Sequence, residues 1–285
     1  MKTCNKPNKM GDIMITHNQM QQIAAEITTA QSAVKQIEPF STRYPDFDLE
    51  TAYAVARIHH QRRTGQGAVL VGRKIGFTNP AMWAHYGVTQ PLWAPLYQTT
   101  VRFVDESEID CSLAEFAEPK IEPELVLHFN RTPPATNDPE AVLACVDWVA
   151  HAFEIVQSHY PRWNFSAADV VADDVLHGTL LVGRPCSIRD LGADLPEKLR
   201  NFTVSLYAQG TLKETGEGRN VLGCPATAVA HLQQVLQHQA ESRTLQAGEL
   251  VTTGTITAAH PVAPGEVWET RIDGLNVPGL KVRFT

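Results

Sequence analysis

Two carboxylates stand two residues apart, at Glu122 and Glu124, inside the strand-like run KIEPELVLHF. Residues two apart on a β-strand point to the same face, so we expect these side chains to lie side by side. Because their neighbours are apolar, the two charges repel each other unless a cation lies between them, and a hard divalent ion is the natural candidate. The alternative is an exposed strand face with two solvated acids, since Glu-x-Glu is a common pattern.

A third carboxylate, Glu154, lies in the almost wholly apolar run WVAHAFEIVQS. Burial of an unpaired carboxylate costs free energy, so Glu154 is expected either near the end of a helix or beside a buried partner. Together with Glu122 and Glu124 it would complete a three-carboxylate site for Mg²⁺ or Mn²⁺. Such a site leaves coordination positions for water and a chelating substrate.

Lys74 lies among apolar residues and glycines in VLVGRKIGFT. Burial in such a setting lowers the pKa of a lysine and fits it for proton transfer, whereas a strand-edge lysine would simply reach water. His177 lies beside Asp173 and Asp174 and precedes an apolar strand. A functional and a structural role are equally open for His177.

The segment TTGTITAAHPVAPGE places Thr253 and Thr255 around Gly254. Hydroxyls and backbone N–H groups there can hold a substrate carboxylate, although a tight turn explains the glycine equally well. The segment is too short for a phosphate-binding P-loop and has no P-loop lysine.

The first elements expected along the chain are helices. Apolar residues recur at three- and four-residue steps over residues 16–37, and a second helix is expected after Asp48. A β-rich run, AVLVGRKIGFT, follows, and residues 79–98 are expected to form a loop, or a short helix and turn. From about Thr100, strand-like runs dominate, interrupted by expected helices at residues 138–156 and 225–238. The expected strands are VRFV, KIEPELVLHF, GTLLVG, FTVSLYAQG, ELVTTGTI, EVWETRIDGL and LKVRFT.

This order predicts an α+β protein with a mixed, mostly β domain folded over itself and an N-terminal helical region. We expect a flexible tail over residues 1–15, the helical region over 16–78 and the catalytic domain over 79–285.

Composition limits the classes of function. Of the 285 residues, 43% are apolar and 19% are charged, which predicts a well-packed core. The net charge of −7 argues against a nucleic-acid partner. The five cysteines show no CxxC spacing, as expected of free thiols in a reducing cytoplasm. There is no apolar run of about 18 residues and no signal-like segment, so neither a membrane span nor secretion is expected.

From about Asp48 to the C-terminus, the chain resembles the 2-keto-4-pentenoate hydratase and 4-oxalocrotonate decarboxylase branch of the fumarylacetoacetate hydrolase superfamily. The matching pieces agree in order and spacing. They are GRKIGFTN, GVTQPLWAPL, KIEPELVLHF, AFEIVQSHYPRW, ADVVADDVLHGTLLVG, VLGCPATAVAHL, LQAGELVTTGTIT and PVAPGE.

The resemblance implies a β-rich fold of the fumarylacetoacetate hydrolase type in a homo-oligomer. It implies that the metal ligands are Glu122, Glu124 and Glu154, and that Lys74 transfers a proton. It also implies that the turn at residues 252–255, with Thr253 and Thr255, lines the substrate pocket.

Two segments depart from the pattern of the dienoate hydratases. An aspartate usually follows the Gln-Pro pair, where this chain has Leu92 and Trp93. Ala-Asp-Asn is usually followed by small residues, where this chain continues from Asp174 through Val-Leu to His177. We therefore expect both segments, with Asp174, to line the substrate pocket. We expect Leu92 and Trp93 as an apolar wall, and His177 as one polar contact, at the end of the substrate farthest from the metal.

The expected substrate is a small 2-oxo or 2-hydroxy-enoic acid, which chelates a metal through its carboxylate and 2-oxygen. Hydration of a 2-hydroxydienoate is the first choice, with Lys74 and His177 moving protons. Decarboxylation of a 4-oxalocrotonate-type acid is second, because Leu92 removes a charge that would repel an anionic substrate end. Hydrolysis of a C–C bond in a diketo acid is third, since it requires a His–Glu pair to activate water. A non-catalytic acid-binding protein is the remaining alternative.

Overall fold

The computed structural model describes residues 15–104, 108–192, 194–239 and 242–285. The tail predicted for residues 1–15 therefore lies, apart from Ile15, outside the described residues.

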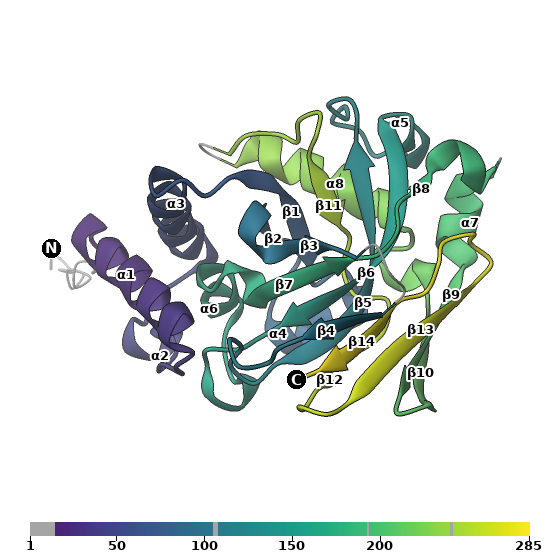
Figure 1. Cartoon of the computed structure of the whole chain (residues 1–285). Coiled ribbons are helices and arrows are strands. Elements are labelled where there is room, and N and C mark those ends of the chain that lie inside the picture. Colours follow the sequence, from purple (N-terminus) through teal and green to yellow (C-terminus); the bar gives the residue numbers. More distant parts are fainter. Residues whose placement is uncertain (1–14, 105–107, 193, 240–241) are drawn as a thin grey trace, which may run out of the picture.

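The two helices expected near the N-terminus are confirmed as α1 (His17–Ala33) and α3 (Leu49–Gly65), with the short α2 (Phe40–Arg43) between them. The side chain of Thr16 caps α1 and that of Asp48 caps α3, each accepting a hydrogen bond from a backbone N–H of the first turn. Figure 1 shows these helices at one end of the molecule, with α6 (Ala167–Ala172) beside them.

A mixed sheet forms the centre of the molecule. Among the described residues it has nine strands, with the path β2-β1-β11-β5-β6-β7-β3, while β12 pairs with β5 and β8 with β6. Its strands are β1 (Leu70–Gly76), β2 (Leu92–Tyr97), β3 (Val101–Phe103), β5 (Lys120–Phe129), β6 (Val146–Val156), β7 (His177–Val182), β8 (Cys186–Ser187), β11 (Leu250–Thr252) and β12 (His260–Pro261).

A second sheet packs against one face of the first. In the described part of the chain it has five strands, in the order β10-β9-β13-β14-β4. Phe153 of the larger sheet and Leu206 and Trp268 of the smaller one belong to the apolar cluster between them. The strands are β4 (Glu108–Cys111), β9 (Thr203–Ala208), β10 (Thr211–Glu217), β13 (Val267–Asp273) and β14 (Lys281–Phe284).

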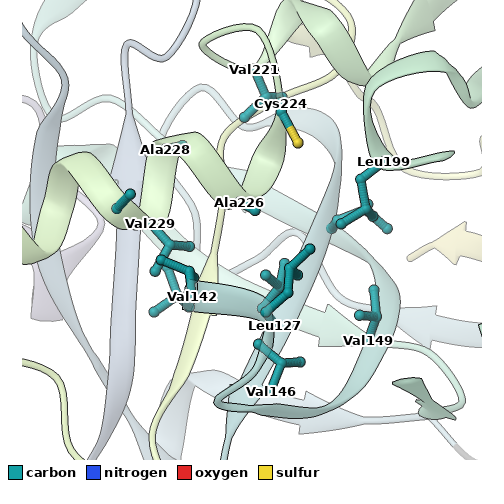
Figure 2. Packing of buried hydrophobic residues seen from close by; sticks show 14 of the residues in the cluster. Leu127, Val142, Val146, Val149, Leu199, Val221, Cys224, Ala226, Ala228 and Val229 are labelled. Atoms are coloured by element: carbon teal, nitrogen blue, oxygen red, sulfur yellow. The ribbon is translucent and has the colours of Figure 1, made fainter. Parts of the chain in front are cut away.

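Helix α8 (Pro225–His238) covers another part of the central sheet, at the bounds expected from the sequence. Figure 2 shows its residues Ala226 and Val229 over the buried side chains of Leu127 and Val146. Burial of this apolar surface fixes the orientation of β5 and β6. Helices α4 (Trp83–Tyr86), α5 (Pro139–Leu143) and α7 (Leu195–Asn201) complete the fold.

Two expectations about local structure are wrong. The helix expected over residues 138–156 is the short α5 followed by the strand β6. Strand β6 is buried on both faces from Val149 onward, and a continuous apolar run has no period that separates strand from helix. The loop expected over residues 79–98 contains α4 but ends in strand β2. The expected strands are otherwise confirmed, although β11 has only three residues.

The predicted boundary at residue 78 falls just after β1, which pairs with β11 inside the central sheet. The sheet therefore extends across this boundary, and the division into two regions stays a prediction. Within the described residues, no helix is long and apolar enough to span a membrane.

Candidate metal centre and substrate cavity

The three glutamates predicted from the sequence lie together. Glu122 of β5 is directly opposite Glu154 of β6 in the antiparallel register, and Glu124 follows two residues later on the same face of β5. One carboxylate oxygen from each residue lies within 4.8 Å of the others. Glu124 and Glu154 are buried, and Glu122 is partly buried.

Hydrogen bonds hold two of these carboxylates in place. The Oε1 atom of Glu154 accepts hydrogen bonds from Lys74 Nζ at 3.0 Å and from His177 Nδ1 at 2.7 Å. The Oε2 atom of Glu124 accepts hydrogen bonds from the Thr252 hydroxyl and from the Gly254 N–H, the latter at 2.8 Å. The Oε2 atom of Glu154 is buried without a hydrogen-bond partner in the described structure, as expected of a metal-facing oxygen.

Three ionised carboxylates beside one lysine would leave the cluster with a net negative charge. Burial, with the nearby charge of Glu154, raises the pKa of Glu122 to about 7. Burial and the two neighbouring carboxylates also raise the pKa of Glu124 well above its usual range. Burial alone would raise the pKa of Glu154, but Lys74 and His177 outweigh it and lower this pKa to about 2. Three carboxylates around one lysine are a donor set that fits Mg²⁺ or Mn²⁺.

Lys74 reaches this cluster from β1. Its ammonium donates hydrogen bonds to Glu154 and, at 2.7 Å, to the Val175 carbonyl, and the side chain is almost fully buried. The sequence suggested a lowered pKa. The pKa of Lys74 is instead raised, because the three carboxylates outweigh the effect of burial. A divalent ion among the carboxylates would oppose their effect.

The carbonyl that holds Lys74 belongs to an unusual turn. Asp174, Val175 and Leu176 all have positive φ, at 50°, 52° and 63°, although none is glycine. Such conformations persist only where the surroundings enforce them. The Asp174 carboxylate accepts a hydrogen bond from Gln31 Nε2 at 3.2 Å and lies 3.3 Å from an Arg63 nitrogen. The N-terminal helices thus anchor the turn that holds Lys74.

The turn after β11 requires its glycine. Gly254 has φ +102°, and a Cβ atom there would lie 2.0 Å from the Thr78 hydroxyl oxygen. The expectation for the neighbouring threonines is met only in part. Thr255 lines the cavity beside the glutamates, whereas the buried Thr253 donates its hydroxyl hydrogen to the Leu125 carbonyl at 3.1 Å and does not line that cavity. Thr252 belongs to the turn expected to line the pocket, but its hydrogen bond to Glu124 was not predicted.

Two of the glutamates, Glu122 and Glu124, line a cavity of about 390 Å³ together with Lys74. Aromatic and polar side chains supply much of the remaining wall. Sequence reasoning missed these wall residues. Lys120 could have been predicted from the sequence, because it lies two residues before Glu122 on the same face of β5. No sequence pattern indicated the other wall residues: Asn79, Tyr86, Trp163, Phe165, Glu214 and Asn220.

The residues expected at the distal end of the substrate do not line this cavity. Leu92 is fully buried in the apolar cluster around the N-terminal helices, because it points away from Trp93 on β2. Trp93 and Asp174 line a second cavity. His177 lies behind Glu154, and its Nε2 shares a 2.9 Å hydrogen bond with the Thr100 hydroxyl. The assignment of Leu92, Trp93 and His177 to the distal end is therefore corrected.

Comparison with known proteins agrees with this geometry. Residues 83–282 match the family described as fumarylacetoacetate (FAA) hydrolase C-terminal, and the chain belongs to this family. It is 33% identical to 2-keto-4-pentenoate hydratase of Paraburkholderia xenovorans (strain LB400), over 92% of this chain and 94% of that protein. It is 32% identical to 4-oxalocrotonate decarboxylase of Pseudomonas sp. (strain CF600), over 92% of this chain and 96% of that protein.

A solved structure extends the comparison to the fold. The 4-oxalocrotonate decarboxylase from Pseudomonas putida G7, complexed with magnesium and adipate, superposes with a TM-score of 0.86 at 28% identity. The match covers 96% of this chain and all of that one. The resemblance inferred from the sequence motifs is therefore confirmed, as is the α+β fold of the fumarylacetoacetate hydrolase type.

Proposed function

We propose that this chain is a divalent-metal-dependent hydro-lyase that adds water to a small 2-hydroxydienoate, an acid like 2-keto-4-pentenoate. The observation that carries the proposal is the contact between Lys74 and Glu154, at 3.0 Å, beside two further carboxylates that line a cavity. This arrangement places a proton carrier next to a cation site. The 33% identity to named hydratases over nearly the whole chain supports the same reading.

Glu122, Glu124 and Glu154 would hold Mg²⁺ or Mn²⁺. The ion would supply a Lewis acid for the carboxylate and 2-oxygen of the substrate. Thr252 and the Gly254 N–H keep one oxygen of Glu124 fixed, and His177 does the same for Glu154. In this scheme His177 is a positioning residue, since it touches a ligand and not the cavity.

Lys74 would move the proton. Water adds at C4 of the 2-oxo-3-enoate form of the substrate, and the resulting enolate takes a proton at C3, which gives a 4-hydroxy-2-oxo acid. The ammonium is fixed by the Val175 carbonyl and Glu154. A fixed donor beside the reacting carbon is the requirement for general acid catalysis. Thr255 would contact the substrate from the cavity wall.

Decarboxylation of a 2-oxo-enedioate is the second candidate, and Lys120 favours it. Its ammonium lies 3.7 Å from the centre of the Trp163 ring, and both side chains line the cavity. A cation there can pair with a second substrate carboxylate, which a simple dienoate does not have. Leu92 does not support this candidate, because it does not line the cavity.

The His–Glu pair that a C–C hydrolase would need exists as His177 and Glu154, but His177 does not line the cavity. Hydrolysis therefore stays the third alternative. A non-catalytic acid-binding protein would not require the buried contact between Lys74 and Glu154. The cytoplasmic location and the homo-oligomer stay predictions.

Turnover of two substrates separates the candidates. The protein is assayed by ultraviolet absorbance with 2-hydroxypenta-2,4-dienoate and with a 2-oxo-hexenedioate, with Mg²⁺ and with a chelator. The proposal expects metal-dependent loss of the dienoate absorbance without release of CO₂. Release of CO₂ from the enedioate, with the dienoate unchanged, would establish the second candidate instead.

A further inference from the structure

Two cavities adjoin strand β1. Lys74 lines the cavity that contains Glu122 and Glu124, whereas its neighbour Arg73 lines a second cavity of about 470 Å³. Successive residues of a strand point to opposite faces, so the side chains of Lys74 and Arg73 point away from each other. The second cavity lies among β1, β2 and α3, which Figure 1 shows side by side. Trp93 and Asp174, which the substrate cavity does not use, line it.

Arg73 is a buried cation whose charge is poorly compensated. Its side chain is 5% exposed, and its Nη1 donates a hydrogen bond to the Gly72 carbonyl at 3.0 Å. The facing carboxylate, Glu249 Oε2, is 3.6 Å away, which is too far for a hydrogen bond. The Nε atom of Arg73 is buried with no hydrogen-bond partner in the described part of the chain. Such a group favours an anion beside it.

The charges around Arg73 also favour an anion. Glu249 is shared, because an Arg243 nitrogen also forms an ion pair with it. Asp174 is matched by Arg63, at 3.3 Å. Three arginines, Arg63, Arg73 and Arg243, lie against two carboxylates, Asp174 and Glu249, so these ion pairs leave one positive charge in excess.

Part of the remaining wall is aromatic and apolar, beside the polar residues His60, Thr64, Gln239 and Ser242. The rings of Tyr53 and Trp93 stack at 5.8 Å with an interplanar angle of 26°. The Arg73 guanidinium lies over the Trp93 ring at 5.6 Å. Leu70 and Val171 add aliphatic surface. A flat apolar group packs favourably on such a wall, and a carboxylate attached to it can reach the guanidinium.

We propose that this second cavity binds a small organic acid made of one carboxylate on a planar unsaturated or aromatic body. The carboxylate pairs with Arg73, and the body packs against Trp93 and Tyr53. A volume of about 470 Å³ is in the range of small-molecule sites. The site adjoins the substrate cavity through Asp174, since the next residue, Val175, supplies the carbonyl that holds Lys74.

Binding of two probes to the metal-free protein tests the proposal. Sorbate represents an unsaturated acid and benzoate an aromatic acid, and neither has a 2-oxo group for chelation. Calorimetry in a chelator removes the contribution of a metal at the glutamates. We expect saturable binding of at least one probe with one site per chain, and the tighter probe identifies the body that the site prefers.

Three variants locate the site. Arg73→Met should weaken binding by about tenfold to a hundredfold, the effect of losing one charged hydrogen-bonding group. Ala56→Phe fills the cavity from α3 without a change of charge and should abolish binding, which keeps the test decisive if Arg73→Met does not fold. Lys74→Met, on the other face of β1, should leave binding unchanged. The control is Arg271→Met, since Arg271 is 69% exposed on the second sheet.

Three results would overturn the proposal. The first is the absence of saturable binding by either probe. The second is binding that Lys74→Met removes and Ala56→Phe does not, because the acid would then occupy the substrate cavity. The third is inorganic phosphate binding as tightly as both probes, because the planar body would then contribute nothing.

Discussion

Glu122 and Glu154 lie directly opposite each other on the neighbouring antiparallel strands β5 and β6. Like charges in that position destabilise a sheet, and burial increases the cost. The pair persists here beside Lys74, and Glu154 Oε2 has no hydrogen-bond partner among the described residues. A buried arrangement of this kind is consistent with a cation site that the fold maintains at the expense of stability.

Replacement of Lys74 by methionine should remove proton transfer and little else. We expect kcat to fall by about 100-fold or more, with a small change in KM, because the glutamates would still hold the metal and the substrate. The measurement is steady-state kinetics at saturating Mg²⁺. Lys281→Met is a matched control, since Lys281 pairs with Glu108 on the second sheet. Near-normal turnover of Lys74→Met would contradict the assigned role.

Asp174 should act through Lys74 without contact with the substrate. Asp174→Asn weakens the ion pair with Arg63 that anchors the left-handed turn, so the Val175 carbonyl should hold Lys74 less firmly. We expect kcat to fall by about tenfold with KM nearly unchanged, since small displacements of a catalytic group reduce its rate strongly.

Steady-state kinetics should be combined with circular dichroism, which separates a local effect from misfolding. Asp110→Asn is the control, because Asp110 is 70% exposed on β4. A rise in KM at constant kcat would indicate that Asp174 binds substrate, as the sequence first suggested.

Burial of His151 makes stability depend on pH. His151 Nδ1 donates a hydrogen bond to the Glu124 carbonyl at 2.9 Å, and burial lowers the pKa of His151 to about 4. The unfolded chain binds this proton at a pKa near 6.5, so between about pH 6.5 and 4 the unfolded state holds more protons. The contribution of His151 to stability therefore falls as the pH falls through this window, by about 2 kcal/mol between pH 6.5 and 5.

Urea unfolding of the wild type and of His151→Gln at several pH values measures this effect. On acidification, the free energy of unfolding of the wild type should decrease relative to that of the variant. Parallel pH dependences of the two proteins would show that His151 is protonated in the folded state.

The sequence was sufficient to predict the strand that carries two of the proposed metal ligands. In KIEPELVLHF, alternation places Glu122 and Glu124 on one face, and β5 has the predicted bounds. The run around Glu154 was harder to interpret because it is buried on both faces and has no strand period. The need for a buried partner still identified Glu154 correctly as a member of the cluster.

The remaining site depended on long-range packing, which local patterns do not contain. Trp93 and Asp174 lie in segments that also flank the active site, but each side chain points into the second cavity. Strand β2 was not predicted, because its segment is rich in proline and aromatic residues. The face to which the Leu92 side chain points could therefore not be assigned. Trp163 and Phe165 reach the substrate cavity from a loop with no period at all.

The most direct test of the account is calorimetric titration of metal-free protein with Mn²⁺, for the wild type and for Glu124→Gln and Glu154→Gln. The account predicts one site per chain in the wild type and affinity at least about tenfold weaker in each variant, with an unchanged circular dichroism spectrum. Glu214→Gln, at the cavity wall but outside the cluster, should bind Mn²⁺ like the wild type. Wild-type Mn²⁺ affinity in both ligand variants would contradict the claim that these glutamates form a metal centre.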